Sequence, residues 1–310
     1  NTFGKHNVGG VFVTERQEQR YQDQWVHSVP KTNVLPLVYF TTMDTYNDTD
    51  NEEARIGYIG RFNYNFANKY YIEVSARRDA SWKFTPDKRV GVFPSASIGW
   101  RITDEPFMKN ILGPKSILDD LKFRASYGVL GDDNIGIGAY DYLTGYNYNS
   151  GTVILSGTPV VTSRDKGQPI TNISWFKSKV TDIGADFSLL GTKLTGSVDY
   201  FHRLRTGLRG RKYDILVPSE LGYSLPDENV NSDAQSGGEI ALQYNNKKGD
   251  FTYSIGGNLS YARSKTVETY KPIFNNSWDN YRNSIENRYT GIFWGYETTG
   301  QFKTMDEINA

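Results

Sequence analysis

The chain has 310 residues, and its 35 Lys and Arg side chains balance 35 Asp and Glu side chains, so the formal net charge is zero. Nucleic-acid binding proteins normally carry a basic excess, and we therefore expect no nucleic-acid partner. The mean hydropathy is −0.58, and no run approaches the roughly 20 apolar residues of a membrane helix. Cysteine is absent and the three histidines are scattered, so we expect no disulfide, metal site or cofactor.

Alternating apolar and polar residues in segments of about ten predict β-strands along the chain. The clearest hairpin joins residues 56–66 to residues 70–77 through a turn at 67–69, and a less regular strand precedes it near 7–21. Further strands are expected near 96–102, 121–129, 181–189, 194–200, 240–244 and 251–261. Long connections are expected at 30–54, 79–92, 131–172, 205–237 and from 263 onward.

The connections alternate in length along the chain. Short turns follow Phe66, Leu189 and Tyr244, and the intermediate segment 104–119 is assigned to the same end. Outer-membrane barrels have short periplasmic turns and long extracellular loops, and a tilted strand of about ten residues crosses the apolar layer. A large soluble β-protein shows the same alternation, with shorter strands and loops. We predict an all-β fold, a segment of a large antiparallel transmembrane β-barrel, with a soluble β-protein as the alternative.

Several stretches resemble the SusC/RagA family of TonB-linked outer-membrane proteins. The first is GRFNYNF at 60–66, followed by KYYI at 69–72 and ARRDAS at 76–81. GVFPSASIGWRI at 91–102 and EPFM at 105–108 continue it, with Ala80 and Lys83 in place of the usual glycine and arginine. The later stretches are LKFRASYG at 121–128 with Gly131-Asp132, LTGSVDYF at 194–201, and GYETTGQF at 295–302 with Glu307-Ile308.

The resemblance implies a 22-stranded barrel with an N-terminal plug and a TonB box. It also implies a SusD-like surface lipoprotein as partner, energy from TonB-ExbB-ExbD, and import of a glycan or peptide across the Gram-negative outer membrane. No signal peptide, plug, TonB box or terminal barrel strand is recognisable in the sequence. About nine strands are countable, and an open sheet would leave unpaired edges in lipid. We therefore expect residues 1–310 to belong to a single barrel domain of a longer polypeptide.

Charged residues in the polar register of the strands are expected to face the barrel lumen, where they would contact one another and a plug. They are Arg61, Glu73, Arg77, Lys122, Arg124, Asp182, Asp186 and Asp199. A catalytic carboxylate pair is the alternative role. No GxSxG element, P-loop or Rossmann glycine pattern occurs, so we predict that the protein is not an enzyme.

Aromatic residues of the long loops are candidates for ligand binding, because their faces stack on sugars or contact peptide side chains. They are Tyr140, Tyr142, Tyr146, Tyr148, Trp278 and Tyr281. Packing within the loops or against a partner is the alternative. Trp100 and Tyr127 suit an interfacial aromatic girdle. The acidic stretch of Asp44, Asp48, Asp50, Glu52 and Glu53 does not fit an EF-hand and is expected at a solvated loop tip.

The sequence thus predicts nutrient import through a barrel embedded in outer-membrane lipid. Ligand capture would use the extracellular loops and the lipoprotein. Two alternatives come from other classes of protein. One is a non-transporting outer-membrane barrel of a secretion or adhesion complex, and the other is a soluble β-rich polysaccharide hydrolase.

Overall fold

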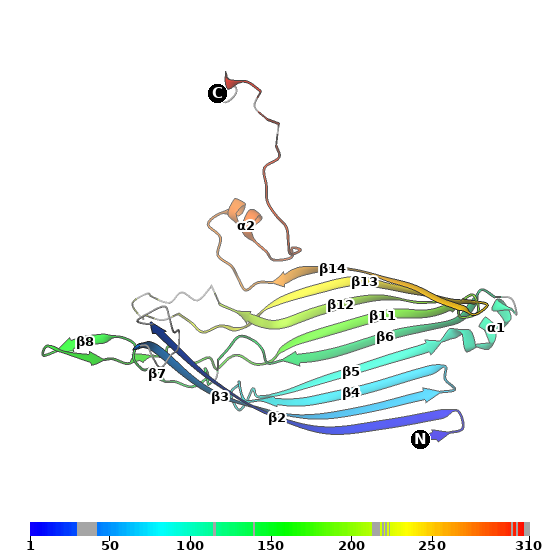
Figure 1. Ribbon diagram of the computed structural model, residues 1–310, viewed down its shortest axis with the longest axis horizontal. Helices are drawn as coiled ribbons and strands as arrows, with labels where there is room; N and C mark the ends of the chain where they lie inside the picture. Colours follow the sequence, from blue (N-terminus) through cyan, green and yellow to red (C-terminus); the bar gives the residue numbers. More distant parts are fainter. Residues whose placement is uncertain are drawn as a thin grey trace.

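A single ten-stranded antiparallel sheet dominates the computed structural model, and its strands follow one another in chain order (Figure 1). The structure describes residues 1–29, 42–113, 116–138, 140–212, 218, 220, 222, 224–298, 300–301 and 303–306. The strands of the sheet are β1 (Thr2–Phe3), β2 (His6–Val29), β3 (Thr42–Phe66), β4 (Tyr70–Ser81), β5 (Val90–Arg101), β6 (Leu118–Asp132), β11 (Phe176–Leu189), β12 (Leu194–Gly210), β13 (Glu228–Lys248) and β14 (Phe251–Glu268).

The remaining elements are short and lie at the ends of the sheet or beyond it. Two small hairpins between β6 and β11 pair β7 (Tyr146–Asn147) with β10 (Arg164–Asp165) and β8 (Thr152–Leu155) with β9 (Thr158–Val161). The helical elements are η2 (Ile102–Asp104), α1 (Pro106–Leu112) and α2 (Ser277–Asn283). Among the described residues, no helix combines the length and apolar character needed to cross a membrane.

One face of the sheet is apolar because the strand register aligns apolar side chains from strand to strand. Phe62 pairs with Val74, Val74 with Ala96, and Ala96 with Tyr127. Successive strand residues point to opposite faces, so the residues between them lie on the other side. We call the first side the apolar face and the second the charged face. This fold is the antiparallel sheet predicted from the sequence.

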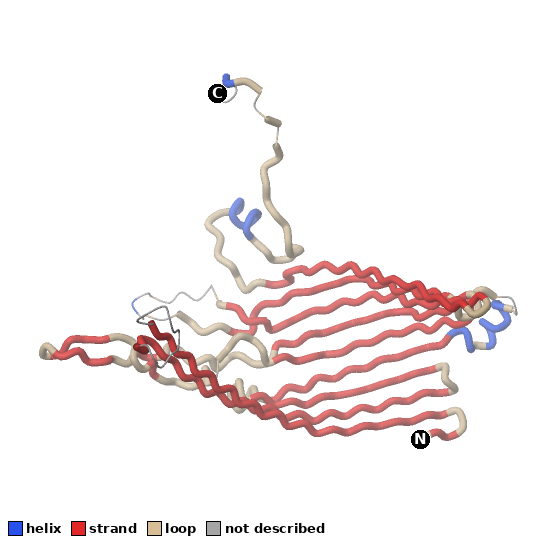
Figure 2. Tube along the Cα trace, in the orientation of Figure 1, coloured by secondary structure: helices blue, strands red, loops and turns tan. Residues whose placement is uncertain are grey.

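Turns and loops are segregated to opposite ends of the sheet. Residues 67–69, residues 190–193 and the Gly249-Asp250 pair form the tight turns at one end, together with α1 (Figures 1 and 2). The segment 104–119 therefore lies at the turn end, as expected. The links after β4, β6 and β12 lie at the other end, which we call the loop end (Figure 2).

Several strands are longer than the sequence pattern predicted. β2 has 24 residues and β3 has 25, so the predicted loop at 30–54 is wrong for residues 42–54, which belong to β3. The acidic stretch from Asp44 to Glu53 accordingly lies in a strand and not at a loop tip. Residues 18–29 and 42–54 form a two-stranded arm beyond the end of β4. Water reaches both faces of this arm, so the apolar alternation that identifies a half-buried strand is missing there.

The main hydrophobic cluster lies at the loop end, outside the regular part of the sheet. Phe84, Ile135, Ile173 and Phe176 are buried, with Trp175 and other partly buried residues packed against them. The cluster joins the link after β4 to the long link between β6 and β11. A charged contact supports it, because the Lys88 ammonium donates to the Thr171 carbonyl at 2.9 Å.

Replacing Phe84 with Ala is expected to release these two links. The side chain is 1% exposed, and deleting a buried Phe typically costs about 3–5 kcal/mol through lost transfer energy and a cavity. Limited proteolysis of the full-length protein should show faster cleavage within residues 82–89 and 133–175. Phe107→Ala is the control, since Phe107 is 49% exposed. Equal cleavage of both variants would contradict a structural role for the cluster.

Candidate functional site

The charged face brings together all eight of the charged residues that the sequence analysis singled out. Arg61 and Glu73 lie on β3 and β4, Lys122 and Arg124 on β6, and the aspartates on β11 and β12. Strand pairing places each of these residues opposite another residue of the charged face. For example, Lys122 pairs with Asp186, and Asp182 pairs with Ser126. The eight residues are Arg61, Glu73, Arg77, Lys122, Arg124, Asp182, Asp186 and Asp199.

Ion pairs neutralise most of this face. The Arg61 guanidinium donates to the Glu73 carboxylate at 2.6 Å. Arg124 uses two nitrogens on Asp186, at 2.9 and 3.0 Å, and its Nη2 also donates to Asp199 at 2.8 Å. An arginine fork that serves two carboxylates gives these strands a defined spacing as well as charge balance.

Other contacts reach across an intervening strand. Arg77 on β4 donates to Asp79 at 2.7 Å and to Glu15 of β2 at 2.9 Å, so its side chain spans β3. The Lys122 ammonium of β6 lies 4.8 Å from the ring centroid of Tyr71 on β4, across β5. Glu15 was not among the predicted residues, because the alternation of its strand is irregular in sequence.

A glycine lies beneath each of these strand-skipping contacts. A Cβ atom added at Gly57 would come within 2.6 Å of the Asp79 carboxylate, beside Arg77. A Cβ at Gly184 would overlap Asp199 and approach Arg124, and one at Gly99 would lie 3.2 Å from Lys122. The missing side chains leave room for long charged groups to lie flat on the sheet, which explains why these strand positions carry glycine.

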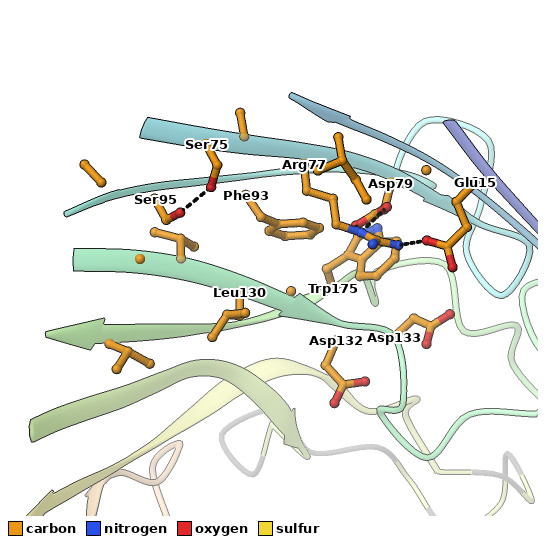
Figure 3. A pocket seen from close by; sticks show the side chains of 18 of the residues that line it. Glu15, Ser75, Arg77, Asp79, Phe93, Ser95, Leu130, Asp132, Asp133 and Trp175 are labelled. Carbon is orange, nitrogen blue, oxygen red and sulfur yellow. Dashed lines mark hydrogen bonds and ion pairs between the residues drawn. The ribbon is translucent and has the colours of Figure 1, made fainter. Parts of the chain in front are cut away.

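A cavity of about 760 Å³ opens on the charged face near the loop end (Figure 3). Arg77 lies between Asp79 and Glu15 on one side of it, and the rings of Phe93 and Trp175 lie close by (Figure 3). The two rings meet edge to face with centroids 5.3 Å apart. The cavity therefore offers charge of both signs beside an aromatic surface, which is a lining suited to polar oligomers.

A buried polar group closes the cavity at its loop end. Asp133 follows β6 and accepts hydrogen bonds from Arg55 at 2.8 Å and from the Ser81 hydroxyl at 2.5 Å. Ser81 is fully buried and Asp133 is 8% exposed. This arrangement ties the middle of β3 to the loop-side ends of β4 and β6, and loss of one partner would leave a buried charge unpaired.

The six predicted aromatic loop residues fall into separate groups. Tyr140 lies 5.9 Å from Trp82 and 6.3 Å from Tyr142 between ring centroids. Tyr146 and Tyr148 are 77% and 83% exposed, at and just beyond β7.

The second group lies in and near α2. The Trp278 and Tyr281 rings are tilted relative to each other with centroids 5.6 Å apart, and Tyr281 meets Trp294 edge to face at 5.2 Å. No ring contact within the described part of the chain joins this group to Tyr140. The structure therefore offers two distinct aromatic surfaces at the loop end, where the sequence suggested one set of loop residues.

Trp82, Trp175 and Phe93 were missed as candidate residues. Trp82 follows β4 and Trp175 precedes β11, so neither stands in a tyrosine-rich loop segment. Trp175 reaches the Arg89 carbonyl at 3.1 Å across 86 residues of sequence, a contact that local pattern does not encode. The sequence signal for Phe93 was its neighbouring glycines, because Gly91 and Gly131 leave the space that its ring occupies.

Glu105 organises the opposite, turn end of the sheet. It accepts hydrogen bonds from the Tyr70 hydroxyl at 2.5 Å and the Trp100 indole at 3.3 Å, and Lys69 lies 3.6 Å away. The Tyr70 hydrogen bond, followed by that of Trp100 and the charge of Lys69, lowers the pKa of Glu105. Trp100, expected in an interfacial girdle, thus lies on the apolar face with its polar edge turned to a carboxylate.

The described residues contain no group of three or more His, Cys, Asp or Glu side chains arranged to hold a metal ion.

No protein-family model matches the chain. TonB-dependent receptor SusC of Bacteroides thetaiotaomicron is 30% identical over 220 residues, which are 69% of this chain and 21% of that receptor. TonB-dependent receptor P39 of Formosa agariphila is 27% identical over 320 residues, covering 99% of this chain and 28% of that receptor.

This chain is a segment of a SusC/RagA-like TonB-dependent receptor. Its fold is similar to that of the RagAB peptide transporter, with a TM-score of 0.70 and 21% identity over 87% of this chain and 29% of that one. The RagAB peptide importer in its open-open state gives a TM-score of 0.72. The names of these proteins confirm the prediction that the chain is not an enzyme. The chain spans between a fifth and a third of their lengths.

Gly184→Val is expected to disrupt the charged face, since the new side chain would displace Asp199 from Arg124. Overpacking of this kind typically costs about 1–3 kcal/mol. Urea unfolding of the full-length protein, followed by tryptophan fluorescence, measures the loss. Gly60→Val is the control, because nothing lies within 4 Å of a Cβ at Gly60. A variant at Gly184 as stable as the control would contradict the role of this glycine.

Acid should weaken the turn end through Glu105. Its pKa is lowered in the folded state, so its contribution is present above its ordinary pKa of 4.5 and is lost as the pH falls through the folded value. The thermal midpoint of wild type should therefore drop more steeply below about pH 4.5 than that of Glu105→Gln. Parallel curves for the two proteins would show that Glu105 does not stabilise this end.

Proposed function

We propose that this chain forms part of the wall of an outer-membrane importer for an oligomeric nutrient, either a glycan or a peptide. The difference between the two faces of the sheet supports the proposal most directly. A band of apolar side chains on one face suits lipid, and ion pairs of both signs on the other suit a water-containing lumen. The eight charged residues of the charged face would then line that lumen.

The rest of the barrel would come from other parts of the polypeptide. Within the described residues, β2 beyond its short pairing with β1 and the part of β14 before Ser264 each present a free edge, and unpaired strand edges are not tolerated in hydrocarbon. We therefore assign residues 1–310 to a single barrel domain whose other strands, plug domain and TonB box lie elsewhere in the protein. The modest share of each relative that this chain covers supports that assignment.

Orientation follows from the lengths of the connections. Short turns face the periplasm and long loops the exterior in outer-membrane barrels, so Glu105 would lie at the inner boundary and the 760 Å³ cavity near the outer mouth. The aromatic surfaces around Tyr140 and Trp278 would meet a ligand first. Arg77, Glu15 and Trp175 would meet it next, inside the mouth.

Partners follow from the resemblance to the receptors named above. We propose a SusD-like surface lipoprotein that delivers ligand to the loop end, and energy from TonB-ExbB-ExbD acting through the N-terminal part of the polypeptide. The RagAB proteins are described as peptide transporters, whereas charges of both signs and abundant hydroxyl groups suit a glycan equally. The proposal therefore names both ligand classes.

Gene disruption in the native host tests the proposal. The mutant should lose growth on one class of oligomer, defined oligopeptides or oligosaccharides, and keep growth on the corresponding monomers. Full-length wild type should restore growth, and an affinity tag on it should bring down an outer-membrane lipoprotein. Unchanged growth on every oligomer, with no lipoprotein recovered, would contradict import.

A second variant links the function to the charged face. Trp175→Ala with Arg77→Gln should reduce oligomer uptake several-fold while the protein still reaches the outer membrane. Phe107→Ala, exposed on α1 at the turn end, is the matched control and should transport normally. Equal uptake by the two variants would place the ligand path elsewhere.

A further inference from the structure

On strands β4–β6 and β11–β14, basic side chains occupy the loop-end part of the apolar face, whereas β2 and β3 carry ion pairs in that register, such as Arg16 with Glu18. Arg78 lies on β4, Lys177 and Lys179 on β11, and Arg263 on β14, all of them exposed. We call these four residues the basic collar. Each occupies the register of the apolar face, whereas the charged residues described above occupy the opposite one.

Strand pairing shows how the collar continues the apolar band. Ile183 and Tyr200 pair in one of the last apolar rows. The next row toward the loops has Arg263 at its β14 position. The row after that runs from Lys179 on β11 across β12 and β13 to Lys265 on β14. Basic side chains therefore enter the apolar register over two rows on β11 and β14, beside apolar neighbours such as Val129 and Leu204. Such a mixture suits the level where a membrane strand would leave hydrocarbon.

Adjacent arginines on β4 show the contrast between the faces. Arg77 turns to the charged face and is neutralised by Asp79 and Glu15. Arg78 turns to the apolar face, opposite Tyr58 and Val92, and makes no ion pair within the described chain. The protein thus supplies carboxylate counter-charges to Arg77 but none to the neighbouring Arg78 within the described residues.

The collar lacks acidic neighbours on its own face. Among the described residues of β4–β6 and β11–β14, no carboxylate occupies this register between the apolar rows and Glu268. Glu268 lies at the loop end of β14. Lys177 and Lys179 make no ion pair within the described residues, and Arg263 lies 3.8 Å from the Tyr289 ring centroid. The collar thus carries positive charge beside an apolar band with no carboxylate to balance it on this stretch of these strands, and an external anion would supply that balance.

We propose that the basic collar binds the phosphate groups of anionic lipid headgroups in the outer leaflet. Lys and Arg side chains next to a hydrocarbon layer extend to its polar boundary, where phosphates accept their hydrogen bonds. The arrangement fits a lipid in two respects, charge complementarity and continuity with the apolar band. The inference rests on the proposed function, because that function places the sheet in the outer membrane and its loop end toward the exterior.

The test uses the full-length protein in a mild neutral detergent. Phosphatidic acid, whose headgroup is a phosphate monoester, is added to the micelles, and phosphatidylcholine and inorganic phosphate serve as separate controls. Phosphatidic acid should raise the thermal midpoint of wild type by several degrees, and the shift should shrink as salt is added. Phosphatidylcholine and inorganic phosphate should have no such effect.

The collar variant combines R78Q, K177Q, K179Q and R263Q. It should bind phosphatidic acid at least about tenfold more weakly. The matched control removes two positive charges at the turn end, K247Q and K248Q, and should respond as wild type does. An equal shift in the collar variant, or a shift reproduced by inorganic phosphate, overturns the proposal.

Two further measurements separate a failed inference from a failed fold or function. The paired variants R78Q/R263Q and K177Q/K179Q should each lose part of the shift, so the proposal remains testable if the fourfold variant does not fold. Membrane fractionation and oligomer uptake are measured in the same strains. Wild type that imports oligomers but gives no phosphatidic acid shift overturns the lipid site alone, whereas loss of outer-membrane location overturns the proposed function.

Discussion

Backbone hydrogen bonding is the constraint on which the rest of this structure depends. A strand in hydrocarbon has no water to accept hydrogen bonds from its N–H groups or donate them to its C=O groups, so each group must pair with a neighbouring strand. The sheet meets this demand with an antiparallel ladder between each strand and the next from β2 to β14, although β5 and β6 pair only over Ser95–Arg101. Because the ladder sets an alternation of side chains, it also separates an apolar face from a charged one. Both the proposed lumen and the basic collar follow from that separation.

Long side chains crowd the charged face, and glycine relieves the crowding. Arg77 reaches Glu15 and Arg124 reaches Asp199, each across an intervening strand. Glycine within a strand normally weakens it, because it offers no side chain to pack and loses more entropy on folding. That cost is offset here by charge-assisted hydrogen bonds that join three strands at once. The glycines are therefore part of the ion-pair network, not interruptions of the sheet.

Sequence reasoning predicted the sheet, its two faces and the eight residues that the structure places on the charged face, because period-two alternation is a local property. It did not predict the arm formed by residues 18–29 and 42–54, since a ribbon with water on both faces has no apolar period. It also missed Trp175 and Asp133, which act through contacts with Arg89 and Arg55. Those contacts join residues about 80 apart in sequence, and only the folded chain brings them together.

The Arg77-Arg78 pair illustrates how one sequence element can serve two environments. Alternation sends the first side chain to partners within the protein and the second to the apolar face, which we propose lies against lipid. Arg77, on the charged face, has Asp79 and Glu15 as fixed counter-charges within the protein. An outward arginine needs none where mobile anionic headgroups can gather around it. In the described parts of β4–β6 and β11–β14, the register of Arg78 and Lys179 holds no carboxylate between the apolar rows and Glu268, in contrast to the two that flank Arg77. In the proposed membrane setting, anionic headgroups and not the polypeptide complete the charge balance of this part of the face.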